Sequence, residues 1–241
     1  MVRSRLDLLL VERGLAESRD RAKAMIMAGL VTVGHQRPAK PGALYPNDVA
    51  IDVKETAQYV GRGGIKLAAA LDAFKIDPTG TVALDVGAST GGFTDCLLQR
   101  GAAKVYAVDV GYGQLAYKLR TDPRVAVMER VNARHGIAIP EQVDVATADV
   151  SFISLRMIVR PIAEVLKRPG VLVLLFKPQF EVGKGQIGKG GVVRDPLLHA
   201  RVLGDFLIWA INGGFRVLGV IPSPITGDAG NREFLIYLRV E

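Results

Sequence analysis

The stretch of residues 81–94, Thr-Val-Ala-Leu-Asp-Val-Gly-Ala-Ser-Thr-Gly-Gly-Phe-Thr, limits the possible folds of this chain more than any other. Val82–Val86 is apolar and contains several β-branched residues, which is typical of a buried strand in a parallel sheet. Glycines follow, and they allow a tight turn and a close approach of the backbone to a ligand. The spacing predicts a helix over residues 93–99 that Gly101 ends. A strand, a glycine turn and a helix in this order form the ligand-binding crevice of doubly wound α/β sheets.

A second strand is predicted over Lys104–Asp109, and its last residue is a carboxylate suited to binding a ribose diol. The glycine pattern differs from the dinucleotide fingerprint, because Asp85 precedes the first glycine and three residues separate Gly87 from Gly91. A carboxylate at Asp85 would repel a pyrophosphate, whereas a ligand with an amine or a sulfonium suits it. We therefore expect S-adenosylmethionine rather than NAD as the ligand.

The rest of the C-terminal part alternates short apolar runs with helical segments, which predicts βαβ units and a doubly wound, Rossmann-like α/β sheet. Strands are expected over residues 125–128, 143–147, 171–176, 215–221 and 234–240, and helices over residues 65–74, 114–119, 154–166 and 195–212.

Residues 1–53 are expected to form a small α+β domain of their own. Leucines at helical spacing predict a helix over residues 6–13. Ser18 is a good N-cap for a second helix that Gly29 ends, and short strands are expected over residues 30–33 and 49–53. We expect a linker over residues 54–62 and one larger domain over residues 63–241.

Composition favours a well-packed globular protein, with 49% hydrophobic residues and a mean hydropathy of +0.23. No apolar run approaches the roughly 18 residues of a membrane span, and the start of the chain does not resemble a signal peptide. The single cysteine, Cys96, falls in the helix after the glycine turn and rules out a disulfide scaffold. We therefore expect a cytoplasmic protein. Three scattered histidines show no ligand spacing, and no metal is expected.

A net charge of +7 and a pI near 9.6 favour a polyanionic partner such as RNA. In the N-terminal part, basic side chains gather toward one helical end, where they could contact phosphates. The alternative is a solvated charged face, which Glu17 and Asp20 make less basic. As a group, the residues expected to bind RNA are Arg5, Arg19, Arg21, Lys23, Arg62, Lys184 and Lys189.

Several motifs carry a resemblance to known families. The N-terminal Ala-Glu-Ser-Arg-Asp-Arg-Ala-Lys-Ala-Met-Ile-Met-Ala-Gly-Leu-Val-Thr-Val-Gly-His-Gln segment resembles the S4-type RNA-binding domain. The rest is similar to FtsJ-type ribose 2′-O-methyltransferases in GRGGIKL, DVGASTGGFTDCLLQRGA, DVSFISL, LFKPQFEVGK and GNREF. Together they resemble the TlyA family of ribosomal RNA methyltransferases, which also carries the name hemolysin.

The resemblance implies S-adenosylmethionine as cofactor, ribosomal RNA as substrate and a cytidine ribose as target. It also implies a catalytic tetrad of Lys66, Asp149, Lys177 and Glu233. A ribose hydroxyl is a poor nucleophile, and two lysines close together favour loss of a proton from one of them. We expect Lys177 to orient or deprotonate the hydroxyl and the carboxylates to hold the lysines, with no metal required.

Cofactor contacts are expected along the glycine turn and at the ends of the next strands. Asn132 could meet the adenine edge or only shape a turn, and the sequence favours neither. The residues assigned to the cofactor are Asp85, Gly87, Ser89, Gly91, Gly92, Phe93, Asp109, Asn132 and Asp149.

Two other functions remain open at this point. One is a membrane-active, hemolysin-like protein, for which no long basic amphipathic helix is found. The other is a ribosomal RNA-binding assembly factor that no longer methylates. The sequence predicts no oligomeric state.

Overall fold

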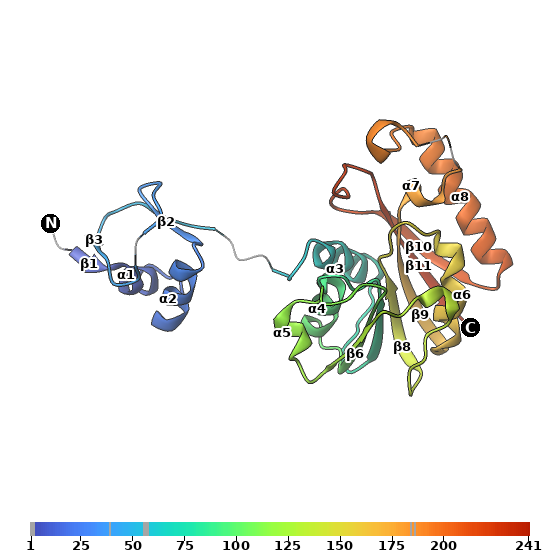
Figure 1. Cartoon of the computed structure of the whole chain (residues 1–241), viewed down its shortest axis with the longest axis horizontal. Coiled ribbons are helices and arrows are strands. Elements are labelled where there is room, and N and C mark those ends of the chain that lie inside the picture. The colour runs from blue at the N-terminus through green and yellow to red at the C-terminus, as the bar shows by residue number, and fades with distance from the viewer. Residues whose placement is uncertain (1–2, 39, 55–57, 184, 186) are drawn as a thin grey trace. The chain divides into compact units, whose positions relative to one another are not determined.

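The structure is a computed structural model, and it describes residues 3–38, 40–54, 58–183, 185 and 187–241. The chain divides into two compact units, Met1–Ala57 and Gln58–Glu241, which are described separately (Figure 1).

The first unit packs two short helices over two small sheets. Helix α1 (Leu6–Glu12) packs against α2 (Arg19–Met27), and the α2 N-terminus is capped by Ser18 Oγ, which accepts a hydrogen bond from Arg21 N at 3.2 Å. The predicted N-cap is thus confirmed. The strands pair antiparallel, β1 (Arg3–Arg5) with β3 (Leu44–Pro46) and β2 (Val31–Val33) with β4 (Ile51–Val53).

The second unit is built on a seven-stranded sheet in the order β10-β11-β9-β8-β5-β6-β7. Strands β5 to β9 are mutually parallel where they pair, and β11 runs antiparallel to both of its neighbours. The predicted doubly wound α/β fold is confirmed. The strands are β5 (Val82–Val86), β6 (Lys104–Asp109), β7 (Val125–Glu129), β8 (Val143–Ala148), β9 (Leu166–Phe176), β10 (Arg216–Pro222) and β11 (Phe234–Val240).

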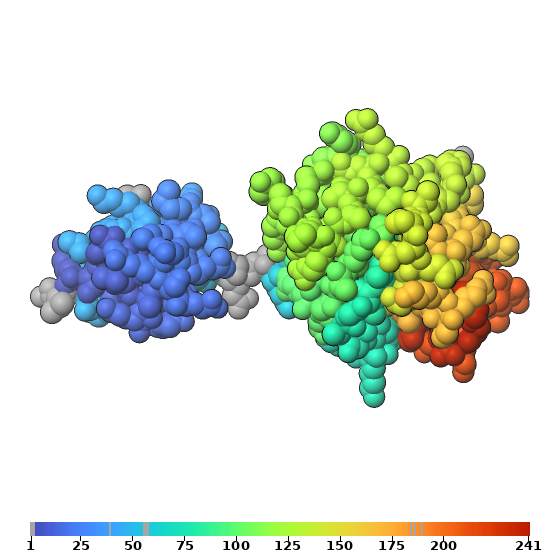
Figure 2. Space-filling view, turned by 90° about the horizontal axis from the view of Figure 1, so that it is seen from below, coloured from blue at the N-terminus to red at the C-terminus, as the bar shows by residue number. Residues whose placement is uncertain are grey.

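Helices cover both faces of this sheet (Figure 1). Successive strand residues point to opposite faces, so Ala83 packs with α3 (Gly63–Phe74) and α4 (Gly92–Gln99), whereas Leu84 packs with α6 (Val159–Glu164) and α8 (Pro196–Asn212). The two faces therefore form separate apolar cores. In the space-filling view the C-terminal residues, in orange and red, lie against the middle of the chain, in yellow and green (Figure 2).

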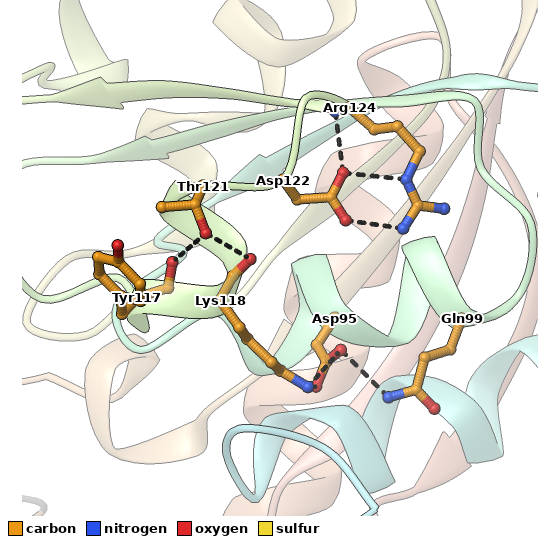
Figure 3. Close-up of polar contacts among 7 residues, drawn as sticks. All are labelled: Asp95, Gln99, Tyr117, Lys118, Thr121, Asp122 and Arg124. Carbon is orange, nitrogen blue, oxygen red and sulfur yellow. Dashed lines mark hydrogen bonds and ion pairs between the residues drawn. The ribbon is translucent and has the colours of Figure 1, made fainter.

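Helix α4 is held to its neighbours through one buried carboxylate. Lys118 of α5 (Tyr117–Arg120) reaches Asp95 of α4 at 3.0 Å, and Gln99 donates to the same carboxylate at 3.1 Å (Figure 3). The backbone N–H of Val60 donates at 2.8 Å to Asp95 Oδ2, the oxygen that Lys118 also reaches, whereas Gln99 donates to Oδ1. Asp95 thus fixes the helix that follows the glycine turn.

Several predicted boundaries differ from the structure by a few residues, and two of the differences change the local architecture. Tyr59 is buried in the second unit, and Val60 bonds to α4, so the predicted linker 54–62 extends too far on that side. The helix predicted over residues 154–166 is broken into a 3₁₀ helix η2 (Leu155–Met157) and α6, and β9 already begins at Leu166, where it pairs with Val143. Residues 55–57 of the predicted linker lie outside the described residues.

Candidate functional site

The glycine turn after β5 brings the ends of two strands together. Gly87 has a φ of +82°, and a Cβ there would lie 2.3 Å from the carbonyl oxygen of Asp149. Asp149 N donates to the Val86 carbonyl at 2.9 Å, which joins the segment after β8 to the end of β5. Only glycine fits between these segments. The site therefore forms at the carboxyl ends of parallel strands, as predicted for a doubly wound sheet.

Two cavities open at this edge of the sheet. The first has a volume of about 620 Å³ and the second about 500 Å³. They share Gly87, Ser89, Asp149, Ser151 and Phe152 in their walls, so they adjoin at the end of β5. A ligand in one cavity can therefore meet a ligand in the other beside Asp149.

The four residues of the predicted tetrad all line the first cavity. Lys66 Nζ donates to Glu233 Oε2 at 2.6 Å, and both side chains are buried. Lys177 Nζ lies 2.6 Å from Asp149 Oδ1 and forms an ion pair with it, although the angles are not those of a hydrogen bond. Lys177 Nζ also donates a hydrogen bond to Ser151 Oγ at 3.0 Å. Two lysine–carboxylate pairs thus face one space.

Each of these side chains comes from the end of an element. Asp149 follows β8, Glu233 precedes β11, and Lys177 is the N-cap of the short helix α7 (Pro178–Glu181). Lys66 lies in the first turn of α3, where the helix dipole disfavours a cation. A buried ammonium requires a partner with opposite charge, and Glu233 provides one.

Most residues assigned to the cofactor line a cavity. Gly87, Ser89, Asp109, Asn132 and Asp149 border the second cavity. Asp109 accepts from Ser89 N at 2.8 Å and Gly111 N at 2.6 Å, which leaves one lone pair on each oxygen for a ligand. Asn132 Oδ1 also accepts from the backbone of Arg134, so it shapes a 3₁₀ turn while bordering the cavity. Gly92 and Phe93 border the first cavity.

Asp85 lines neither cavity, and its assignment as a cofactor ligand stays a prediction. Its side chain is fully buried and accepts hydrogen bonds from Thr94 Oγ1 at 2.7 Å and Thr147 Oγ1 at 3.2 Å. Burial raises the pKa of Asp85 to about 7. Because neighbouring strand residues face opposite sides of the sheet, a carboxylate one position from the turn need not point to its ligand side.

Gly91 also lies outside both cavity walls. Its φ is +97°, and a Cβ there would lie 2.2 Å from Leu119 Cδ1 of α5. This glycine allows the start of α4 to pack against α5 rather than touching a ligand.

The structure pairs several of the basic residues expected to bind RNA. Arg5 and Arg19 both bond to the buried Asp7 at 2.9 Å and hold the pKa of that carboxyl well below its usual range. Lys23 pairs with Asp20 at 2.9 Å. These side chains therefore stiffen the helical end as well as presenting charge there.

The remaining basic candidates differ in their surroundings. Arg21 is exposed on α2. Arg62 lines the first cavity and bonds to Asp228 Oδ1 at 2.7 Å and to the Thr226 carbonyl at 2.8 Å. Lys184 and the side chain of Lys189 lie outside the described residues.

Sequence reasoning assigned no role to several residues of the first cavity, among which Phe152 and Gln179 stand out. Phe152 has a φ of +65°, is 92% exposed and packs beside Phe180 with ring centroids 5.2 Å apart. Gln179 lies in the same wall. Both fall inside motifs that the sequence singles out, but no periodicity marks their orientation.

The segment bearing Phe152 is fixed from α7. Glu181 accepts from Ser154 Oγ and from Leu155 N, each at 2.7 Å, and its burial raises the pKa of Glu181. The aromatic pair is thus held in place by a contact between two elements.

The described ranges contain no group of three potential metal ligands. Within the same ranges, no helix is long and apolar enough to cross a membrane.

A mostly parallel sheet with one antiparallel strand and two adjoining cavities at its carboxyl edge is a Rossmann-like ligand-binding architecture. The family description "FtsJ-like methyltransferase" matches residues 59–240, and "S4 domain" matches residues 4–43. The chain belongs to the FtsJ-like methyltransferases and, within them, to the TlyA family.

Three relatives illustrate this membership. The 16S/23S rRNA (cytidine-2′-O)-methyltransferase TlyA of Mycobacterium tuberculosis is 48% identical, over 99% of this chain and 91% of that protein. Hemolysin A of Brachyspira hyodysenteriae is 41% identical, over 97% of this chain and 98% of that protein. A solved structure from Streptococcus thermophilus that carries the name hemolysin is 44% identical, with a TM-score of 0.74 and coverage of 100% and 89%.

The fold of the second unit recurs at low identity. A solved S-adenosylmethionine-dependent methyltransferase from Mesorhizobium loti shares 17% identity and a TM-score of 0.56, and it covers 74% of this chain and is itself covered completely. This similarity supports the fold alone.

Proposed function

We propose that this protein transfers a methyl group from S-adenosylmethionine to a ribose 2′-hydroxyl of ribosomal RNA, with cytidine as the target. The observation that supports this most is the convergence of Lys66–Glu233 and Lys177–Asp149 on one cavity that adjoins a second, ligand-sized cavity. The rRNA target follows from the name of the 48% identical relative.

The second cavity fits the cofactor's requirements. Asp109 offers carboxylate lone pairs to the ribose diol, and Asn132 borders the same space. Gly87 removes the side chain that would obstruct the approach to Asp149. When bound, S-adenosylmethionine supplies an electrophilic methyl group.

In the first cavity, Lys177 orients the 2′-hydroxyl, and its amine, after it has released its own proton, takes the hydroxyl proton as the oxygen attacks the methyl carbon. Asp149 and Ser151 hold the Lys177 amine, and Glu233 holds the Lys66 ammonium. Alignment of the hydroxyl for in-line displacement supplies much of the rate. The exposed Phe152 and the half-buried Phe180 offer aromatic surface to the target base.

The first unit is proposed to bind ribosomal RNA through its exposed basic face, which gives affinity without sequence preference. Since ribosomes are the substrate, the reaction is proposed to take place in the cytoplasm.

The test is transfer of labelled methyl to ribosomal subunits from a strain that lacks this activity, with product mapping by 2′-O-methyl-sensitive primer extension. We expect Lys177→Ala to reduce transfer by at least about 100-fold, the scale of a lost acid–base group. Lys167→Ala is the matched control, because Lys167 pairs with Asp144 at 2.7 Å near the opposite edge of the sheet.

If Lys177→Ala transfers methyl groups as fast as wild type does, the assigned role of that lysine is contradicted. Cofactor binding without transfer to either subunit would contradict the substrate assignment. A protein that binds ribosomal RNA but not the cofactor would instead be an assembly factor.

A further inference from the structure

Gln179 stands out among the polar side chains of the first cavity. It is the second residue of α7, two positions after Lys177, and it lies in the cavity wall. Its carbonyl oxygen Oε1 is buried and has no hydrogen-bond partner. Apart from Asp149 Oδ1, which Lys177 neutralises, no other buried side-chain oxygen or nitrogen of the described residues shares this condition.

Neighbouring polar groups in the wall have partners within the chain. Lys66 bonds to Glu233. Asn231 accepts from Val193 N and donates to the Gly191 carbonyl, both at 3.0 Å. A buried carbonyl without a partner costs free energy, and an apolar side chain of the same size would pack there without that cost. The geometry therefore points to a partner that enters the cavity from outside.

The surroundings of Gln179 suit the edge of a nucleobase. Phe180 follows it directly and packs beside Phe152, so apolar ring faces and one carboxamide share the same wall. A carboxamide offers an acceptor oxygen beside an N–H donor. Cytosine presents the complementary order, an exocyclic amine beside a ring acceptor, whereas uracil presents a carbonyl where cytosine has the amine.

We propose that Gln179 determines the base specificity of the reaction, with its carbonyl oxygen accepting a hydrogen bond from the exocyclic amine of the target cytosine. Because the oxygen is buried in the absence of the base, this contact requires the Gln179 side-chain amide to rotate toward the cavity when the base enters. This inference rests on the proposed function, because it requires a ribonucleotide in the first cavity.

The test uses the full-length protein and two sets of ribosomal subunits, with cytidine or uridine at the mapped target position. The variants are Gln179→Met, which keeps size and removes hydrogen bonding, and Gln142→Met, an exposed control outside both cavities. We expect wild type and Gln142→Met to prefer cytidine in kcat/KM by about 10- to 100-fold, the discrimination of a good base contact. In Gln179→Met this preference falls below about threefold, because the cytidine rate drops while the uridine rate stays within threefold.

A second variant separates recognition from packing. Gln179→Glu retains an acceptor oxygen and is expected to keep a preference for cytidine of at least about tenfold. Cofactor affinity by calorimetry is expected to match wild type in both Gln179 variants, because the residue lies outside the second cavity. The thermal unfolding temperature of Gln179→Met is expected to equal or exceed that of wild type, because the substitution removes the unpartnered carbonyl.

Three outcomes would overturn this inference alone: a wild-type enzyme that does not distinguish cytidine from uridine, an unchanged preference in Gln179→Met, or an equal loss on both substrates. Absence of wild-type transfer to cytidine subunits, with the cofactor bound, would contradict the proposed function and this inference together.

Discussion

At the scale of single residues, Asp85 shows how burial changes the meaning of a sequence position. The carboxyl group lies at the end of β5 without exposed surface, and its partners are two threonine hydroxyls rather than a cation. Desolvation disfavours the charged form and raises the pKa to about 7. Asp85 therefore joins the end of β5 to α4 and β8 through Thr94 and Thr147, and its pKa lies near neutral pH.

Asp85→Asn is expected to remove a pH dependence of stability. Because the folded-state pKa of about 7 exceeds the unfolded value near 3.8, the native state holds the proton longer, and wild type loses stability as pH rises between these values. A shift of this size corresponds to about 4 kcal/mol at most, at about 1.4 kcal/mol per pKa unit. Urea unfolding at pH 5 and pH 8 measures about 3 kcal/mol of this, because pH 5 already lies above the unfolded value.

Asp77→Asn is the control for this experiment, because Asp77 is an exposed carboxylate whose pKa is lowered by hydrogen bonds from Thr79. If the unfolding free energy of wild type changes with pH no more than that of Asp85→Asn, the raised pKa assigned to Asp85 is contradicted.

At the scale of elements, one carboxylate joins the start of α1 to α2. Asp7 is buried and receives both Arg5, which precedes α1, and Arg19 at the start of α2. These contacts fix the helical end where phosphate contacts were predicted. The same arginines therefore have a structural role, and replacing them would alter more than the charge of the surface.

Asp7→Asn is expected to lower the unfolding temperature of the first unit by roughly 5–10 °C near pH 7. The folded-state pKa of Asp7 is depressed, so its stabilisation is complete above the unfolded value near 3.8 and disappears as pH falls below it. Calorimetry at pH 7 and pH 3 measures this. Asp20→Asn removes an exposed ion pair with Lys23 and should change the unfolding temperature little. If Asp7→Asn lowers the unfolding temperature as much at pH 3 as at pH 7, relative to wild type, the assignment is contradicted.

Local sequence patterns predicted many of the elements of the second unit. The predicted bounds of β5 and β6 match the observed bounds residue for residue, because buried parallel strands are short, apolar runs that the sequence shows directly. The strands β1 and β3 were missed, since three residues are too few for an alternating pattern. The break before α6 was missed because helical periodicity alone cannot locate a short 3₁₀ turn.

The candidate site was predictable only in part. Family motifs identified Lys66, Asp149, Lys177 and Glu233, and the structure brings them to one cavity. The direction of Asp85 and the unpaired oxygen of Gln179 depend on packing between distant elements. A linear pattern contains no information on such contacts, which is why both escaped it.

At the scale of the whole molecule, the proposed function divides RNA binding and catalysis between the two units. Both cavities are lined by residues of the second unit. Deleting residues 1–57 is therefore expected to leave folding and cofactor binding of residues 58–241 unchanged. Transfer to ribosomal subunits should fall by at least about tenfold, and its salt dependence should weaken because phosphate contacts are lost.

Calorimetric cofactor titration and methyl transfer at 50 and 200 mM salt measure this division. A second unit that methylates subunits as well as the whole chain does, at both salt concentrations, would contradict a binding role for the first unit.

The insertion of β11 between β9 and β10 also sets the order in which the protein becomes active during its synthesis. Lys66 and Glu233 are 167 residues apart, and the pair forms only when the strand that follows Glu233 can enter the sheet. At about 5–20 residues per second, roughly 8–33 s pass between the two residues. During this interval a nascent chain lacks the Lys66–Glu233 pair and the last strand of its sheet, so translation that stops early is expected to yield a protein without methyl transfer.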